Sequence, residues 1–105
     1  MVLKDILYKV TINAVMGSTS IVINKIEFDS RQINNNDIFI AISGTITDGH
    51  NYIEKAIKDG AVCIVCEKLP DSLENGVTYI EVANSNQALA HMSANYFEHP
   101  SENLK

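Results

Sequence analysis

The feature that most limits how this chain can fold is an apolar run near its middle, from Ile38 to Ile42. Three consecutive asparagines, Asn34 to Asn36, precede the run, and a polar segment that begins with Ser43-Gly44 follows it. An apolar run of this length between turn residues is typical of a buried β-strand. The glycine-punctuated loop after it leads into a helical pattern, and in α/β domains ligands tend to lie where a strand ends and such a loop begins.

Hydrophobic periodicity along the rest of the chain predicts further strands and helices. Residues 2–10, 51–60 and 84–97 have helical spacing, whereas residues 21–23, 26–28, 61–66 and 77–82 have the composition of strands. The order of these elements predicts an α/β fold, a mixed sheet of about five strands flanked by helices. Residues 1–98 would form one domain, and the polar stretch 99–105 would be a linker.

Several residues are predicted to mark the ends and the inner face of the helices. Asn51 with Glu54, and Asn84 with Gln87, have the spacing of helix starts. Gly60 is suited to the left-handed position that ends a helix. The residues expected on the inner face of the last helix are Leu89, Met92, Ser93, Tyr96 and Phe97.

Composition excludes some classes of protein. The formal net charge is -5, which argues against a protein that binds nucleic acid or acidic membranes through a basic surface. No apolar stretch approaches the roughly 18 residues of a membrane span, and the first residues do not resemble a signal peptide. With two cysteines and no export signal, we expect a cytoplasmic protein.

Cys63 and Cys66 have the C-x-x-C spacing of some redox and zinc sites, but they fall within an apolar run that reads as a strand. Residues three apart on a strand point to opposite faces. We therefore expect two structural cysteines, with no disulfide or shared metal. The three histidines lack metal-ligand spacing, so no metal site is predicted, and His91 is expected on the exposed face of the last helix.

The loop from Gly44 to Asn51 has the G-x-x-x-x-G spacing of a phosphate-binding P-loop. His50 and Asn51 stand where that motif has its Lys and its Ser or Thr, so the loop should not support nucleotide triphosphate hydrolysis. Two interpretations remain open. The loop amides and the following helix start could hold a diphosphate or sugar hydroxyls, or the loop could be a plain connection.

Asp29, Ser30 and Arg31 follow a predicted strand. If the backbone stays extended there, Ser30 could offer its hydroxyl to a ligand. The alternative is an Asp29–Arg31 surface pair that closes a turn and contributes little. No nucleophile–base pair, carboxylate dyad or metal triad is visible, so no catalytic residue is predicted.

The chain resembles the N-terminal domain of the Mur ligases. The resemblance extends from about residue 26 to the end and tilts toward the branch that adds the third amino acid, UDP-N-acetylmuramoyl-tripeptide synthetase, because of the ending YFEHPS. Asn36 departs from the family pattern, which commonly has glycine there. The residues that carry the resemblance are Phe28-Asp-Ser-Arg31, Asp37-Ile-Phe-Ile-Ala41, Gly44, Asp48-Gly-His50, Ile53, Ala56-Ile57, Gly60-Ala61 and Tyr96 to Ser101.

This resemblance implies a domain that docks UDP-N-acetylmuramoyl-dipeptide for an ATP-dependent amino-acid ligase of peptidoglycan biosynthesis. ATP and Mg²⁺ would be needed by the full-length ligase, with no cofactor in this chain, and the chain would pack against a central ligase domain. The family's substrate contacts carry over to Phe28, Ser30, Thr45, Ile46 and Thr47. Alternatives are the branch that adds D-Ala-D-Ala, or a stand-alone binding module without ligase activity.

Overall fold

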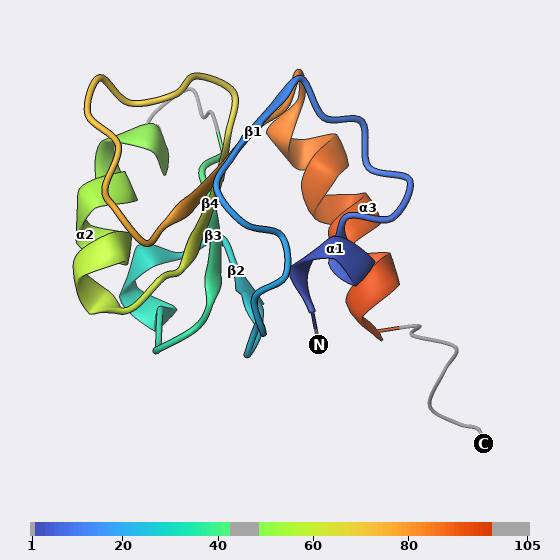
Figure 1. Cartoon of the computed structure of the whole chain (residues 1–105), viewed down its shortest axis with the longest axis horizontal. Helices are drawn as coiled ribbons and strands as arrows, with labels where there is room; N and C mark the ends of the chain where they lie inside the picture. Colours follow the sequence, from blue (N-terminus) through green and yellow to red (C-terminus); the bar gives the residue numbers. More distant parts are fainter. Residues whose placement is uncertain (1, 43–48, 98–105) are drawn as a thin grey trace.

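The computed structural model describes residues 2–42 and 49–97. Helices and strands alternate along most of it (Figure 1). The strands are β1 (Ala14–Met16), β2 (Ile26–Glu27), β3 (Ile38–Ile40), β4 (Cys63–Cys66) and β5 (Thr78–Glu81). The helices are α1 (Leu3–Ile6), α2 (Ile53–Asp59) and α3 (Ser85–Phe97), with short 3₁₀ helices η1 (Ser30–Gln32) and η2 (Gly49–Tyr52).

The five strands form one mixed sheet in the order β1-β5-β4-β3-β2. Strands β2 to β5 pair in parallel, and β1 runs antiparallel to β5, with Val15 opposite Ile80. The predicted fold class is therefore confirmed. Two details of the prediction were wrong: β1 was not expected, and Val22 makes only an isolated bridge to Val2 where residues 21–23 were expected as a strand.

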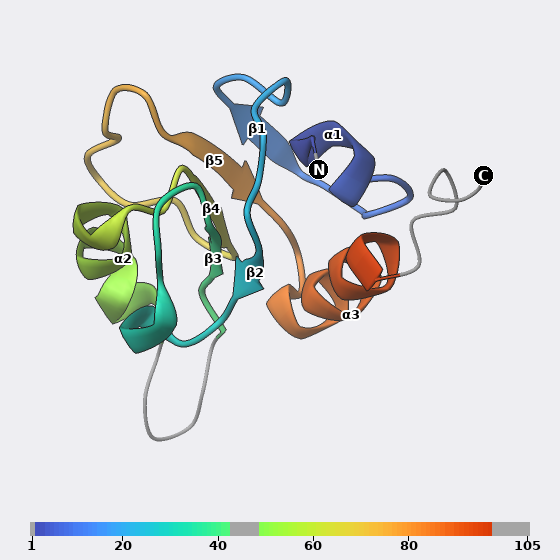
Figure 2. The same ribbon diagram turned by 90° about the horizontal axis from the view of Figure 1, so that it is seen from below.

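Helices cover both faces of the sheet, so it is the middle of three layers (Figures 1 and 2). Helix α2 packs on one face, and α1 and α3 pack on the other. The alternation of side chains along each strand supplies both layers from one apolar run. Ile38 and Ile40 of β3 belong to the core on the α1/α3 side, whereas Phe39 belongs to the core on the α2 side.

Two connections depend on backbone conformations with positive φ. Gly60 ends α2 at φ 123°, as predicted, and a Cβ there would lie 2.8 Å from the Cα of Asn35. Asn36 lies at φ 68° in the turn before β3. Asparagine tolerates this left-handed conformation better than most residues. Asn36 can therefore form the turn at a position where the resembled family commonly has glycine.

The predicted ends and faces of the helices are only partly right. Asn84 Oδ1 accepts a hydrogen bond from the Gln87 amide at 3.0 Å, as expected for the start of α3. Helix α2 instead begins two residues after Asn51 and has no side-chain cap, because η2 occupies the position of the expected helix start.

The predicted inner face of α3 is largely confirmed. Met92 is buried, and Leu89 and Tyr96 pack against the core, whereas Phe97, expected inside, is 79% exposed. His91 is exposed, as predicted. The helix at the start of the chain is also shorter than expected, because α1 covers only part of residues 2–10. Within the described residues, no helix has the length and apolar character needed to span a bilayer.

Candidate functional site

Two connections that carry predicted site residues begin at the carboxyl ends of neighbouring strands, and this end of the sheet is called its edge in the description of the site. β2 and β3 are parallel neighbours, with Glu27 opposite Phe39, so their carboxyl ends lie together. The connection after β2 forms η1, and the connection after β3 leads to η2 and α2. Figure 2 shows the teal turn of η1 beside α2. This is the part of an α/β sheet where ligands usually bind.

The segment Asp29–Gln32, called here the Ser30 turn, is a tight turn and not an extended strand. Asp29 Oδ1 accepts hydrogen bonds from the amide of Arg31 at 2.9 Å and from its Nε at 3.0 Å. Asp29 Oδ2 accepts a third from Arg31 Nη2 at 2.9 Å. The condition for the extended interpretation is not met, and Asp29 and Arg31 close the turn.

The charges in this turn compensate each other. Hydrogen bonds from the Arg31 side chain and amide hold the pKa of Asp29 below its ordinary value, and Lys55 of α2 adds a smaller effect. The hydrogen bond to Asp29 raises the pKa of Arg31, with a smaller contribution from Tyr52. The first turn of α2 is therefore close enough to act electrostatically on the Ser30 turn.

Ser30 is the distinctive polar group of the turn. It is only 7% exposed, yet its hydroxyl has no hydrogen-bond partner among residues 2–42 and 49–97. Buried polar side chains in folded proteins nearly always have a partner. The hydroxyl is therefore available to a group outside the described part of the chain.

The other predicted contact residues are placed differently. Phe28, directly after the partly buried strand β2, is 60% exposed. Thr45, Ile46 and Thr47 lie outside the described residues. Phe28 and Ser30, two residues apart, therefore both lie in the connection that follows β2, and the contacts from the loop remain predictions.

Sequence reasoning missed an ionic cluster around one buried carboxylate, close to the Ser30 turn. The carboxylate of Asp37 is fully buried and lies 2.7 Å from Lys25 Nζ. Lys25 Nζ also donates to the carbonyl oxygen of Gln32, the last residue of the turn, at 2.7 Å. The available signal was a single charged residue placed directly before each of two predicted strands.

A cavity of about 350 Å³ also escaped the sequence analysis. It lies between α2 and the loop after β4, on the same side of the sheet as α2. Three carboxylic acids occur in its lining, and the buried Tyr79 hydroxyl accepts a hydrogen bond from the Glu74 amide at 2.9 Å. The lining residues are Asn51, Ile53, Glu54, Ile57, Pro70, Asp71, Ser72, Glu74 and Tyr79.

Cys63 and Cys66 point to opposite faces of a buried strand, as predicted. Cys63 and Cys66 are free, buried thiols in the cores on opposite faces of the sheet. Burial raises the pKa of Cys63, and raises the pKa of Cys66 to about 11. Both groups are therefore protonated and unreactive at neutral pH. Across the described ranges, no group of three potential metal-binding His, Cys, Asp or Glu residues is present.

Comparison with known proteins places this chain among ligases. The family described as "Mur ligase family, catalytic domain" matches residues 22–97. Two similar proteins are UDP-N-acetylmuramoyl-L-alanyl-D-glutamate–2,6-diaminopimelate ligases. The one from Bacteroides fragilis is 41% identical over 105 residues, and the one from Clostridium tetani is 44% identical over 107 residues. Each match covers 100% of this chain and 22% of the relative, so the chain spans about a fifth of their length.

The fold has the same relatives. A crystal structure of MurF from Acinetobacter baumannii superimposes with a TM-score of 0.62 at 27% identity, covering 73% of this chain and 16% of that protein. The agreement between family match, sequence relatives and fold confirms the resemblance carried by the DSR and DGH motifs. The chain belongs to the Mur ligase family.

Proposed function

We propose that this chain is the substrate-docking domain of a cytoplasmic, ATP-dependent amino-acid ligase of peptidoglycan synthesis. It would hold the UDP end of UDP-N-acetylmuramoyl-dipeptide at the edge formed by the Ser30 turn and the loop after β3. The observation that carries the proposal is the Ser30 hydroxyl, which is buried at this edge without a partner in the described part of the chain. A ligand oxygen or ring nitrogen would satisfy it.

The surroundings of Ser30 suit a ligand with both polar and flat apolar parts. The exposed side chain of Phe28, two residues before Ser30 in the chain, offers an apolar surface. Arg31 is 80% exposed at its side chain but is paired with Asp29. Binding would therefore depend on hydrogen bonds from the turn and from the residue 45–47 amides more than on a free positive charge.

The ATP and Mg²⁺ of the family reaction do not fit the described residues. No acidic or histidine cluster could hold the metal there, and the loop after β3 lacks the P-loop lysine. We infer that ATP is bound by another part of the whole ligase, which this domain would pack against. By analogy with the named relatives, the amino acid added is 2,6-diaminopimelate.

An amide NMR titration tests the docking role. The chain is titrated with UDP and then with UDP-N-acetylmuramoyl-dipeptide, and Ser30→Ala is titrated in parallel. Saturable shifts confined to residues 28–31 and 44–51, weakened by Ser30→Ala, are expected. Shifts at other positions would contradict the assigned residues, and a wild-type chain without shifts at millimolar ligand would count against UDP docking at this edge.

The second candidate is the docking domain of the ligase that adds D-Ala-D-Ala, because the superimposing crystal structure is a MurF. The two candidates differ in the peptide carried by the substrate. The same titration with the UDP-linked tripeptide separates them. Tighter binding of the dipeptide form supports the first candidate, and tighter binding of the tripeptide form supports the second.

A further inference from the structure

We propose that Lys25 is a positioning residue that holds the Ser30 turn in its ligand-receiving place. The inference rests on the proposed function of the Ser30 turn. Lys25 lies outside this turn and contacts it. Lys25 precedes β2, and Asp37 precedes β3, so the two residues stand at the amino ends of neighbouring parallel strands. The connection between these strands contains the Ser30 turn and closes back on this pair.

Lys25 fastens the end of the turn directly. Its Nζ donates to the carbonyl oxygen of Gln32 at 2.7 Å and to Asp37 Oδ2 at 2.7 Å. The start of the turn is held by Asp29, as described above, and Gln32 N–H donates to the Asp29 carbonyl at 2.9 Å. Loss of Lys25 would therefore free one end of a short turn whose other end is fixed only locally.

Asp37 makes the position of the lysine rigid. Its carboxylate is fully buried, and a buried charge needs a counter-charge and hydrogen bonds to be tolerated. Asn24 Nδ2 donates to Oδ1 at 3.0 Å, and the Asn34 amide donates to Oδ2 at 2.7 Å. Lys25 supplies the positive charge, with Glu27 a more distant partner at 3.6 Å.

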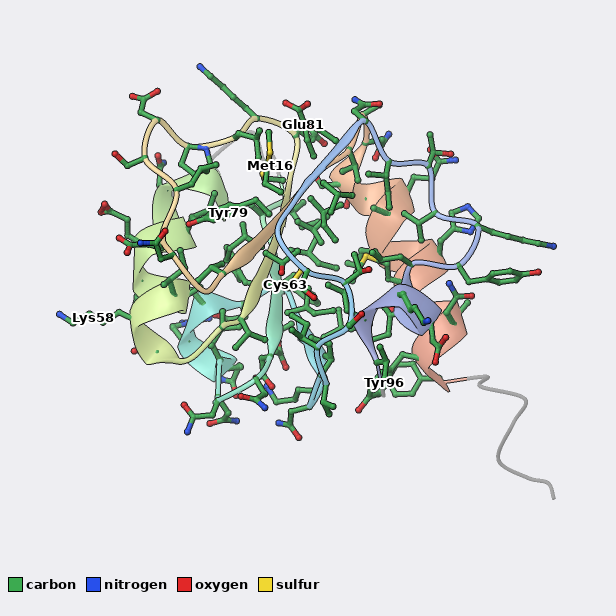
Figure 3. All side chains as sticks on the ribbon, in the orientation of Figure 1. Met16, Lys58, Cys63, Tyr79, Glu81 and Tyr96 are labelled. Carbon is green, nitrogen blue, oxygen red and sulfur yellow. The ribbon has the colours of Figure 1, made fainter. Side chains whose placement is uncertain are left out.

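The cluster is also held from the far face of the sheet. The Tyr96 hydroxyl, on the last part of α3, donates to the carbonyl oxygen of Asn24 at 2.6 Å. Figure 3 shows the labelled Tyr96 at the end of α3. The residue that bonds Asp37 is thereby fixed to a helix of 13 residues. The base of the Ser30 turn is therefore anchored to the sheet and to α3, whereas the turn itself lies at the sheet edge.

The test compares the wild type with the double variant Lys25→Met/Asp37→Asn. Replacing both residues removes the ion pair without leaving a buried charge unpaired, which would be strongly destabilising. The matched control is Lys58→Met, because Lys58 extends from α2 into solvent and has no ion pair within the described residues (Figure 3). Hydrogen exchange of each amide and the UDP dissociation constant are measured by NMR, with unfolding measured in urea.

The double variant should exchange the Arg31 and Gln32 amides at least tenfold faster, while amides of β4 change less than threefold. Its UDP dissociation constant should rise at least fivefold, and Lys58→Met should match the wild type in both. If the double variant does not fold, Asp37→Asn alone should show smaller changes in the same direction.

Unchanged exchange in the Ser30 turn of a folded variant would overturn the role of Lys25, whatever UDP does. Faster exchange with an unchanged UDP dissociation constant would also overturn it, because the turn would then be held without consequence for the ligand. A wild-type chain that gives no UDP response, while the variant still shows faster exchange, would overturn the docking function and leave the anchoring of the turn by Lys25 supported.

Discussion

The starts of α2 and α3 occupy equivalent places in the fold but are completed differently. Each helix follows a parallel strand and begins near the same edge of the sheet. At the start of α3, side chains of the same protein accept hydrogen bonds from the first amides of the helix. Glu67 Oε2 accepts hydrogen bonds from the amide and the hydroxyl of Ser85, both at 2.8 Å, and Asn84 caps the Gln87 amide. The start of α2, beside the Ser30 turn, has no side-chain cap.

The two helix starts therefore differ in whether side chains accept hydrogen bonds from their first amides: at α3 they do, and at α2 no side chain caps the helix. Anions are favoured at helix starts because unpaired amides point outward there. Glu67, at the end of β4, already satisfies this preference at α3. The Ser30 hydroxyl, which has no partner in the described part of the chain, lies instead in the turn beside α2, on the side assigned to the ligand.

The largest expected loss of stability is at Gly60, the residue that ends α2. Gly60→Ala should destabilise the chain by roughly 2–4 kcal/mol, since it combines a strained φ of 123° with a Cβ 2.6–2.9 Å from atoms of Asn35. Urea denaturation gives the change in the free energy of unfolding. Gly76→Ala is the control, because Gly76 has φ 84° but nothing within 4 Å of a Cβ, and it should lose only about 1 kcal/mol. Equal losses would contradict the close approach.

Removing the carboxylate that completes α3 should have the next largest effect. Glu67→Ala leaves the fully buried Ser85 hydroxyl and its amide without their acceptor, which should cost about 1–3 kcal/mol. Glu54→Ala is the matched control, since Glu54 lies in the first turn of α2 and is exposed. Thermal unfolding should show a clear decrease in Tm for Glu67→Ala only. A similar decrease for both would remove the distinction between the two helix starts.

The two asparagines with the same spacing offer a smaller and sharper contrast. Asn84→Ala should cost about 1 kcal/mol, the usual value of an N-cap. Asn51→Ala should change the free energy of unfolding by less than about 0.5 kcal/mol, because Asn51 is exposed and lies in η2 and not at a helix cap. Urea denaturation of both variants decides this. A loss at Asn51 as large as at Asn84 would show that α2 is capped after all.

The smallest effect is expected at the exposed cap of η1. The pKa of the Asp29 carboxyl is lowered from 3.8 mainly by the hydrogen bond from Arg31. Because the unfolded chain binds the proton more readily, the contribution of Asp29 is present above pH 3.8 and is lost as the pH falls through the lowered pKa. An NMR titration of the carboxyl carbon should show this lowered pKa, and Arg31→Ala should return it toward 3.8. An unshifted Asp29 would mean that the pair does not form in solution.

Much of the fold could be predicted because the buried strands are continuous apolar runs in the sequence. The runs around Ile38 and Ile64 are apolar on both faces, and Gly60 marks a turn that other residues do not tolerate. Strand β1 was missed because Val15 and Met16 are 40% and 45% exposed at a sheet edge, and such a strand lacks the composition of a buried one.

For the candidate site, the sequence could predict the position of the turn after β2 but not the contacts that the turn makes. The pattern D-S-R located the turn after β2, but its conformation depends on Asp29 bonding to Arg31 and not on propensity. The Lys25–Asp37 pair is long-range: residues 12 apart meet because two strands lie side by side. The same-spaced pairs at Asn51 and Asn84 differ because η2 precedes only one of the helices. These outcomes depend on tertiary context, which residue spacing alone does not contain.

The placement of the two cysteines gives each layer of the domain its own chemical reporter. Cys63 faces α1 and α3, and Cys66 faces α2. An alkylating reagent can reach either thiol only when the covering helices move away, since both are fully buried. The ratio of the two labelling rates would therefore record which side of the sheet opens more often. The natural chain carries this readout without an introduced probe.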